Sequence, residues 1–201
     1  MANQKILINE ATIQERIRQL AEEITDDYKG EKLTLICILK GSIYFFTDLS
    51  RRINLDTELE FIRVSSYEGE NSTGEITLKL GLDNPVTNKN VIVIEDIIDT
   101  GKTLSYLMDY LSNQKPKSLK LCTLLNKLER RDKETNVKVD YVGFTIPNHF
   151  VIGYGLDLDE QYRNIPQINC MVTENASEKK IENDAREIQK QLKKIPQKKN
   201  T

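Results

Sequence analysis

The sequence predicts an α/β fold in which helices cover both faces of a mainly parallel central sheet. Strand-like segments alternate along the chain with segments whose apolar residues recur at helical spacing. Some strand-like segments are continuous apolar runs, such as residues 33–39, which is typical of parallel strands buried on both faces. With 201 residues, 38% of them hydrophobic, the chain can form a core without disulfides or structural metal. These observations favour one compact α/β domain.

Local patterns predict the individual elements in chain order. Apolar residues at helical spacing predict an amphipathic helix over 10–27, which Tyr28-Lys29-Gly30 ends. A second helical pattern runs from Ile43 to Ile53, with Ser42 placed as its N-cap. The remaining expected elements are strands at 33–39, 91–98, 118–125 and 139–146, extended segments at 57–66 and 76–82, and a helix opened by residues 100–103.

Charge and cysteine usage argue against several classes of protein. Lys and Arg number 29 against 31 Asp and Glu, so the net charge is −2 and neither nucleic acid nor a membrane is expected as a partner. Cys37, Cys122 and Cys170 lie in apolar stretches without CxxC spacing, which favours reduced core thiols. The N-terminus lacks the apolar core of a signal peptide, and no stretch is long enough to span a membrane. We therefore expect a soluble, cytoplasmic protein.

The segment VIVIEDIIDTGKT, residues 91–103, carries the strongest signal for chemistry. Glu95, Asp96 and Asp99 lie near the end of an apolar strand, where ligands bind in parallel sheets. Burial of three carboxylates is unfavourable unless cations or hydroxyl groups meet them. Gly101 then opens a helix, whose free N–H groups and positive dipole end can bind phosphate. Together these features fit a phosphorylated sugar.

A nucleotide-triphosphate P-loop is a competing interpretation of Gly101-Lys102-Thr103. That motif requires a glycine five positions before Gly101, and Asp96 occupies this position. The sequence therefore excludes the P-loop.

Residues 95–103, EDIIDTGKT, resemble the phosphoribosyl pyrophosphate signature of type I phosphoribosyltransferases, in the form found in hypoxanthine-guanine members. Lys40-Gly41 resembles the pyrophosphate loop of this family, and SSYEGENSTGEI, residues 65–76, resembles its flexible loop. VGFTIPNHFVIGYGLDLDEQYRNIPQI, residues 142–168, resembles its purine-binding end. The resemblance covers residues 8–172 and implies the type I phosphoribosyltransferase fold, with a small hood beside the central sheet.

The resemblance implies roles in sugar and phosphate binding. Glu95 and Asp96 match the pair that accepts hydrogen bonds from the ribose hydroxyls, partly through Mg²⁺. The 5′-phosphate is expected at the backbone and hydroxyl groups of Thr100, Gly101, Lys102 and Thr103. The side chain of Lys102 could instead point outward.

Other positions match the family's pyrophosphate and metal site. In this family a cis peptide in the first loop directs N–H groups at pyrophosphate, and Lys40-Gly41 stands at that position. Arg163 matches a basic residue that engages pyrophosphate, for which a guanidinium group is suited. Asp157 matches a carboxylate that orders a second Mg²⁺ through water. Ser66 and Tyr67 open the arm that is expected to close over the site.

The purine site is expected at four positions. Asp99 matches the general base near purine N7, although an aspartate here could merely cap the following helix. Lys127 matches the donor to the purine O6, and alone it would be taken for a surface lysine. Phe150 matches the aromatic side chain that stacks on the base, and Val151 the backbone that reads its edge; alone, either would be assigned to the core. His149, the only histidine, is expected on the surface or rim.

The resemblance implies a purine salvage enzyme that transfers the 5-phosphoribosyl group from phosphoribosyl pyrophosphate to hypoxanthine and/or guanine, giving IMP or GMP and pyrophosphate. One alternative is a nucleotide-sensing regulator of the same fold without turnover, which the presence of Asp99 opposes. Another is transfer to a different base, but Lys127 and Phe150-Val151 favour a 6-oxopurine. Family habit implies a homodimer or homotetramer.

The domain organisation is expected to be one phosphoribosyltransferase domain over 1–175, with a flexible loop at about 65–78 and a hood at about 145–172. Residues 176–201 form a charged tail with a helical apolar seam, made of Ile181, Ala185, Ile188, Leu192 and Ile195. The seam could dock on its own domain, fray in solvent or join an oligomer. No motif lies beyond 172, so no catalytic role is expected for the tail.

Overall fold

The computed structural model describes residues 3–66, 76–132, 135 and 137–194. The helices are α1 (Glu10–Asp27), α2 (Ile43–Ser50), α3 (Lys102–Ser112), the short 3-10 helix η1 (Leu128–Arg130) and α4 (Glu178–Lys194). The strands are β1 (Gln4–Ile8), β2 (Leu33–Ile38), β3 (Thr57–Ser66), β4 (Ile76–Leu80), β5 (Asn90–Ile98), β6 (Ser118–Asn126), β7 (Tyr141–Thr145), β8 (Val151–Ile152) and β9 (Ile168–Met171).

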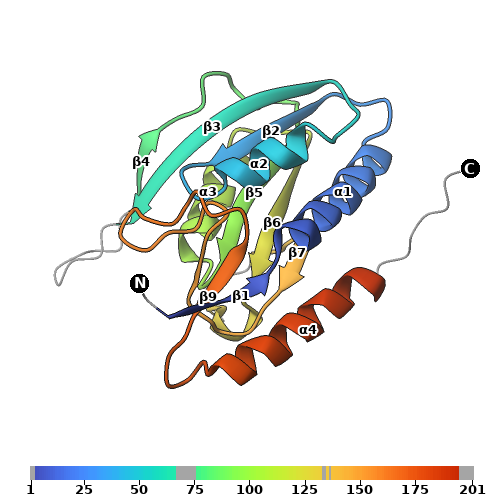
Figure 1. Ribbon diagram of the computed structural model, residues 1–201. Coiled ribbons are helices and arrows are strands. Elements are labelled where there is room, and N and C mark those ends of the chain that lie inside the picture. Colours follow the sequence, from blue (N-terminus) through green and yellow to red (C-terminus); the bar gives the residue numbers. More distant parts are fainter. Residues whose placement is uncertain (1–2, 67–75, 133–134, 136, 195–201) are drawn as a thin grey trace, which may run out of the picture.

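The central sheet has six strands in the order β4-β3-β2-β5-β6-β7 (Figure 1). The strands β3, β2, β5, β6 and β7 are parallel, and β4 pairs antiparallel with β3. From β2 the chain moves outward to β3 and then returns to β5 on the other side of β2. The strand order therefore reverses between β2 and β5, and the crevice beyond their carboxyl ends is where such folds bind ligands.

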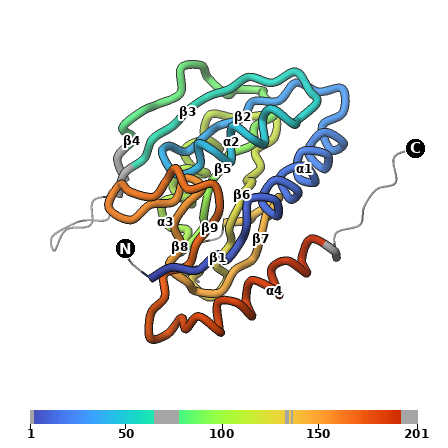
Figure 2. Tube along the Cα trace, in the orientation of Figure 1, coloured from blue at the N-terminus to red at the C-terminus, as the bar shows by residue number. Residues whose placement is uncertain are grey.

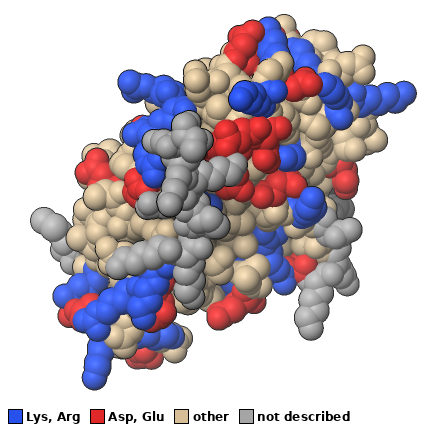
Figure 3. All heavy atoms as spheres, turned by 90° about the vertical axis from the view of Figure 1, so that its right-hand side faces the viewer, with Lys and Arg blue, Asp and Glu red and all other residues tan. Residues whose placement is uncertain are grey.

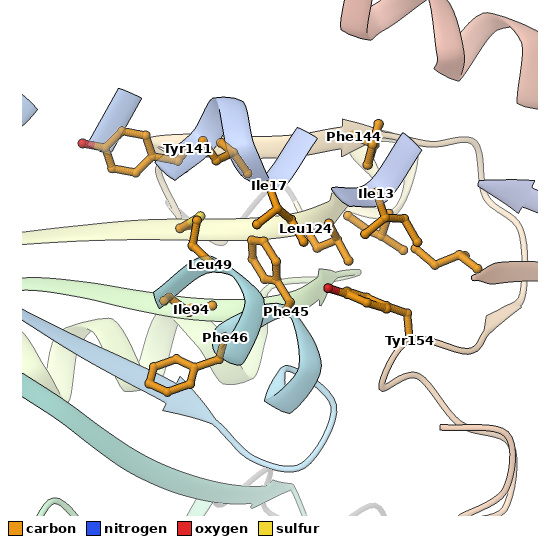
Figure 4. Close-up of a cluster of buried hydrophobic side chains, with 14 of the residues drawn as sticks. Ile13, Ile17, Phe45, Phe46, Leu49, Ile94, Leu124, Tyr141, Phe144 and Tyr154 are labelled. Carbon is orange, nitrogen blue, oxygen red and sulfur yellow. The ribbon is translucent and has the colours of Figure 1, made fainter. Parts of the chain in front are cut away.

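Helices cover both faces of this sheet, which confirms the predicted fold class. Side chains alternate along each strand, so Leu35 and Cys37 of β2 face α1 and α2, whereas Ile36 packs on the α3 side. Figure 4 shows the first of these cores, where Ile17 and Phe45 meet between the helices and the sheet. The three cysteines are free and buried, as expected.

A second, three-stranded sheet lies beside the central one, in the order β1-β9-β8 (Figure 2). Its strands are antiparallel, with Lys5 opposite Cys170 and Val151 also opposite Cys170. Sequence patterns did not predict β1, β8 or β9, because each has five residues or fewer and pairs with a distant segment. The hood segment therefore contains a sheet whose third strand comes from the N-terminus.

Helix α4 docks on the domain to which it belongs. Ile181 and Ile188 are 0% and 2% exposed, and Ala185 and Leu192 pack against the same core as α1. The helix contacts β1, β7 and α1, and it lies along the lower right of Figure 1. The described part of the seam therefore packs on the chain's own domain, which was one of the three alternatives. Ile195 lies outside the described residues.

Two expectations from the sequence are corrected by the structure. His149 is 3% exposed rather than on the surface, because Asp184 of α4 covers it. Ser42 stands at the N-cap position of α2, but its hydroxyl donates to the carbonyl oxygen of Ile38 and, in the described part of the chain, makes no capping bond.

None of the helices in the described ranges combines the length and apolar character needed to cross a bilayer. Acidic and basic side chains both occur on the face shown in Figure 3, in line with the net charge of −2.

Candidate active site

A cavity of about 510 Å³ lies at the point where the strand order reverses. Its walls come from the loop after β2, the end of β5, the start of α3 and the segment between β8 and β9. Most of the predicted site residues line it, namely Gly41, Glu95, Asp96, Asp99, Thr100, Gly101, Lys102, Thr103, Asp157 and Arg163. Segments separated by more than 100 residues in the sequence therefore meet in one crevice.

Half-buried Glu95 and buried Asp96 form an acidic pair near the end of β5. Burial, and then the neighbouring Asp96 carboxylate, raise the pKa of Glu95 well above its ordinary value. The Oε2 atom of Glu95 is enclosed and has no hydrogen-bond partner among the described residues. Asp96 is 8% exposed, and burial raises its pKa although the N–H of Ile97 donates to Oδ1 over 2.7 Å. The pair therefore lacks the polar partners that a bound ligand could supply.

Glycine allows three chain segments to meet beside this pair. A Cβ atom on Gly41 would lie 1.7 Å from Oδ2 of Asp96, and one on Gly155 would lie 1.8 Å from the carbonyl oxygen of Gly41. The peptide bond between Leu39 and Lys40 is cis, at the loop where the family resemblance implies such a bond. The loop after β2 thus lies directly between the end of β5 and the hood segment.

Ion pairs join the first loop to the hood segment on the other side of the cavity. The Nζ of Lys40 lies 3.0 Å from both carboxylate oxygens of Glu160. The guanidinium of Arg163 donates to the carbonyl oxygen of Gly155 over 2.8 Å and pairs with Asp157 at 2.9 Å and Glu160 at 3.2 Å. The Nε of Arg163 is buried without a partner in the described structure. Glu160, which sequence reasoning missed, therefore connects the two predicted pyrophosphate-binding cations.

The loop before α3 has the geometry of an anion cup. Gly101 has φ +86° and immediately precedes α3. The N-terminal end of α3, where the first N–H groups have no partner within the helix, lines the cavity. Gly101 has no side chain with which to cap the helix. The Nζ of Lys102 points outward and lies 3.0 Å from Oδ2 of Asp132, which agrees with the alternative that this side chain points away from the phosphate site.

Asp99 lies between two cations rather than capping α3. Its Oδ1 accepts from the Nε of Arg130 over 2.8 Å, and its Oδ2 lies 3.7 Å from the Nζ of Lys127. Lys127 is 7% exposed, and burial lowers the pKa of its amine. The surface interpretation of Lys127 is therefore wrong. Arg130 was missed, since it stands in a charged run, LERRDK, that contains no motif.

The predicted base-binding residues lie on the hood sheet. Phe150 is 51% exposed, so its ring is available to a ligand, and the interpretation of this residue as core is wrong. The N–H of Met171 donates to the carbonyl oxygen of Phe150, which makes Phe150 and Met171 a hydrogen-bonded pair. Val151, opposite Cys170, then occupies the next, non-hydrogen-bonded position, so its N–H and C=O point away from β9. These groups are free of the sheet's own ladder.

Two predicted residues fall at the arm. Ser66 ends β3, where its backbone lies opposite Ile76 of β4. Tyr67 lies outside the described residues. Val64, two residues before Ser66, lines the cavity, so the arm begins at its edge.

Comparison with known proteins identifies the class of this fold and site. The family model for the phosphoribosyl transferase domain matches residues 3–159. The chain therefore belongs to the phosphoribosyltransferase family, as the sequence resemblance implied. Its relatives lie in the hypoxanthine-guanine group: the hypoxanthine phosphoribosyltransferase of Buchnera aphidicola is 46% identical over 84% of this chain and 96% of that protein.

Other relatives and solved structures agree. A hypoxanthine-guanine phosphoribosyltransferase structure from Bacillus anthracis is 45% identical, with a TM-score of 0.79 over 86% of this chain and 100% of that one. The bifunctional protein TilS/HprT of Listeria monocytogenes is 47% identical over 87% of this chain, but the match spans 27% of that protein.

The close approach at Gly155 predicts a specific destabilisation. Gly155 (φ +101°) and Gly30 (φ +81°) both have left-handed backbone, but a Cβ on Gly30 would meet no described atom within 4 Å. Both Ala variants are strained by their φ, and Gly155→Ala must in addition displace the Gly41 carbonyl. We expect Gly155→Ala to lower the free energy of unfolding by about 1–3 kcal/mol more than Gly30→Ala in urea titrations. Equal losses would contradict this packing.

The buried acidic pair predicts a pH-dependent gain of stability in Glu95→Gln. The pKa of Glu95 is raised in the folded protein, so stability falls as pH rises from the unfolded pKa, about 4.3, through the folded one. Gln has no such cost, so the ligand-free variant should melt a few degrees higher at pH 8, at about 2–4 °C per kcal/mol, and this gain should vanish near pH 4.

The matched control for this prediction is Glu129→Gln, which removes an exposed carboxylate on η1. Calorimetric melting temperatures across pH 4–8 for the three proteins measure the effect. A Glu95→Gln protein that melts below wild type at pH 8 would rule out the inferred cost of this carboxylate.

Proposed function

We propose that this chain is a purine salvage enzyme that transfers the 5-phosphoribosyl group from phosphoribosyl pyrophosphate to hypoxanthine or guanine. The single observation that carries this proposal is the convergence in one cavity of an acidic pair, Asp99 and a glycine-opened helix N-terminus. All the relatives cited above are named as such transferases or contain one, which favours turnover over a nucleotide-sensing regulator.

The sugar and its phosphates fit the cavity in one orientation. The 5′-phosphate binds at Thr100–Thr103, where helix N–H groups and two hydroxyls converge. The ribose hydroxyls donate to Glu95 and Asp96, which satisfies a carboxylate oxygen that otherwise lacks a partner. Pyrophosphate lies on the side of Gly41 and Arg163. There it replaces the Asp157 and Glu160 carboxylates as the anionic partner of Arg163.

Mg²⁺ fits the acidic residues at this cavity. Among the described residues no three His, Cys, Asp or Glu side chains form a ready-made metal cluster. Mg²⁺ is usually bound by one or two carboxylates, with water and substrate phosphates completing its shell, and Glu95, Asp96 and Asp157 offer that donor set. When bound, the ion supplies positive charge that stabilises the negative charge growing on the leaving pyrophosphate.

The base binds on the opposite side of the sugar, against the hood. Phe150 stacks on the purine, and the outward-pointing backbone groups of Val151 pair with its edge. Lys127 donates to O6 and Asp99 faces N7; the 3.7 Å between Lys127 Nζ and Asp99 Oδ2 supports this pairing, because O6 and N7 are neighbours on a 6-oxopurine ring. Adenine presents an amine at this point, so two donors would meet.

The reaction breaks the bond between C1′ and the pyrophosphate oxygen and forms a bond between C1′ and a purine nitrogen. Electrons of the broken bond leave with pyrophosphate, and Asp99 holds the proton that the purine releases. Arg163 and the N–H groups near Gly41 stabilise the leaving charge. Water would attack C1′ and must be excluded during transfer; the arm expected to do this, from Ser66 and Tyr67 onward, lies mostly outside the described residues.

Self-association as a homodimer or homotetramer is part of the proposal. Large apolar side chains are exposed beside each other on α2 and β3, where Phe61 is 38% exposed and its ring contacts Phe46. Tyr44 and Leu59 on the same two elements are 42% and 48% exposed. Apolar surface of this kind favours an interface between subunits.

Asp99→Asn is expected to retain phosphoribosyl pyrophosphate binding and to lower kcat by about 10²–10⁴-fold, because the amide cannot accept the proton. Calorimetric titration measures binding, and pyrophosphate release measures turnover. Asp109→Asn, an exposed position on α3, serves as the control and should match wild type. A folded Asp99→Asn protein with wild-type kcat would remove the role of Asp99.

Lys127→Ala tests the choice of base and the function itself. Pyrophosphate release is assayed with hypoxanthine, guanine, xanthine, adenine and uracil. We expect wild type to use hypoxanthine or guanine and adenine poorly, and Lys127→Ala to lose about 10- to 100-fold in kcat/KM for the oxopurine, the cost of about 1.4–3 kcal/mol for a lost charged hydrogen bond.

The control in this assay is Lys138→Ala, whose side chain is 85% exposed. Pyrophosphate release that is equal for all five bases, or that occurs only with uracil, would contradict the choice of a 6-oxopurine and favour transfer to another base. No release with any base in wild-type protein that binds nucleotides would instead favour the regulator.

A further inference from the structure

The only histidine of the chain is buried at a position for which the proposed reaction has no use. His149 is 3% exposed, and its Nε2 lies 2.7 Å from Oδ2 of Asp184 in α4. The next two residues are Phe150 and Val151, which bind the base in the proposed function. A buried histidine needs a polar partner, and here that partner comes from the C-terminal helix.

A second polar contact joins α4 to the same segment. The side chain of Gln191 donates to the carbonyl oxygen of Thr145 over 2.8 Å and accepts from the N–H of Thr145 over 3.1 Å. Thr145 ends β7, which is the edge strand of the central sheet. Gln191 therefore satisfies both backbone groups of Thr145, as a neighbouring strand would.

These two contacts lie at either end of the connection from β7 to the base-binding residues. Between them the N–H of His149 donates to the carbonyl oxygen of Pro147 over 2.7 Å, which forms a tight turn. Beyond them Phe150 is held by Met171 of β9. The segment 145–150 is thus fixed from one side by α4 and from the other by the hood sheet.

Helix α4 is itself firmly attached. Ile181 and Ile188, one turn before and after the polar contact of Asp184, are almost fully buried. Near its start, Glu178 pairs with Lys5 of β1 at 2.9 Å. None of the described α4 residues lines the cavity, so any effect on substrate is indirect.

We propose that α4 is a positioning element for the base, which acts through Asp184–His149 and Gln191–Thr145 to hold Phe150 and Val151 in their binding geometry. The proposal rests on the proposed function, because it takes Phe150 and Val151 as the base site. Asp184 and Gln191 are positioning residues, which touch no substrate.

The electrostatics of Cys170 agree with this arrangement. Burial first raises the pKa of this thiol, to about 11; Asp184 raises it further, and Lys127 opposes the shift. Cys170 is the residue opposite Val151 in the hood sheet. Asp184 is therefore close to the strand that supports the base-binding backbone.

Helix α4 lies outside the part of the chain that the family model matches, whereas His149 lies inside it. The family model ends at residue 159, before α4 begins. The Bacillus anthracis structure is matched over its whole length by 86% of this chain. The positioning role thus deepens the expectation that the tail has no catalytic group.

The test separates base binding from binding of the sugar phosphate. We expect Asp184→Ala to raise KM for hypoxanthine or guanine by roughly 3- to 30-fold, the range for loss of a packed contact that couples two sites. KM for phosphoribosyl pyrophosphate should stay within about twofold, because none of the described α4 residues lines the cavity proposed to bind it. Likewise, calorimetry should show weaker binding of IMP or GMP and unchanged binding of phosphoribosyl pyrophosphate.

Two companion variants keep the result interpretable. Glu182→Ala, an exposed acidic position on the same helix, should match wild type in both KM values. Asp184→Asn keeps an oxygen that can accept from His149 and should recover most of the affinity for the base. Equal loss for both substrates, or no loss in folded Asp184→Ala, would overturn the proposal.

Hydrogen exchange supplies a readout that requires no turnover. Amides of residues 145–152 should exchange faster in Asp184→Ala and Gln191→Ala than in Asp184→Asn and Glu182→Ala, and Gln191→Ala alone supplies this readout if Asp184→Ala does not fold. Unchanged exchange in both variants would overturn the proposal. Absence of turnover in wild type would remove the proposed function, yet the exchange data would still decide whether α4 holds this segment.

Discussion

The loss of solvation of two adjacent carboxylates near the end of the central strand β5 is the constraint on which the rest of the site depends. Glu95 and Asp96 lie where the strand order reverses, and burial raises the pKa of both. The hydrophobic cores on both faces of the sheet stabilise β5, and their burial offsets the unfavourable free energy of removing these carboxylates from water. The oxygen of Glu95 that lacks a partner is then available to a hydroxyl group or a cation, which is how an unfavourable position becomes a binding site.

The parts of the structure that sequence could predict are those in which local pattern and tertiary structure agree. Helix α1 was expected at 10–27 and is found at Glu10–Asp27, because its apolar face and its end signals are all local. Strands β2 and β5 of the central sheet are apolar runs and were expected for the same reason. The acidic residues near the end of β5 could be assigned to the crevice because parallel strands must all end at the same edge.

What sequence could not predict depends on pairs of residues far apart in the chain. Strand β1 has no distinct pattern, and its pairing with β9 crosses more than 160 positions. His149 has no local signal of burial, since Asp184 covers it from a helix that begins 29 residues later. Arg130 is one of several charges in its run, and only the folded chain brings it to Asp99. Long-range side-chain partners are fixed by packing, which no short window of sequence contains.

The ion pairs of the site differ from the buried acidic pair in how readily they can be exchanged. Asp99 and Arg130 are 40% and 49% exposed, and the Lys40–Glu160 pair is more exposed on its acidic side. Exposed pairs contribute only about 0–1 kcal/mol, so a substrate can replace one partner at little cost. These pairs keep the Lys40 and Arg130 side chains near the cavity but hold them only weakly. The strongly disfavoured charges thus lie at Glu95 and Asp96, the proposed sugar site, and the weakly held pairs lie at the proposed pyrophosphate and base sites.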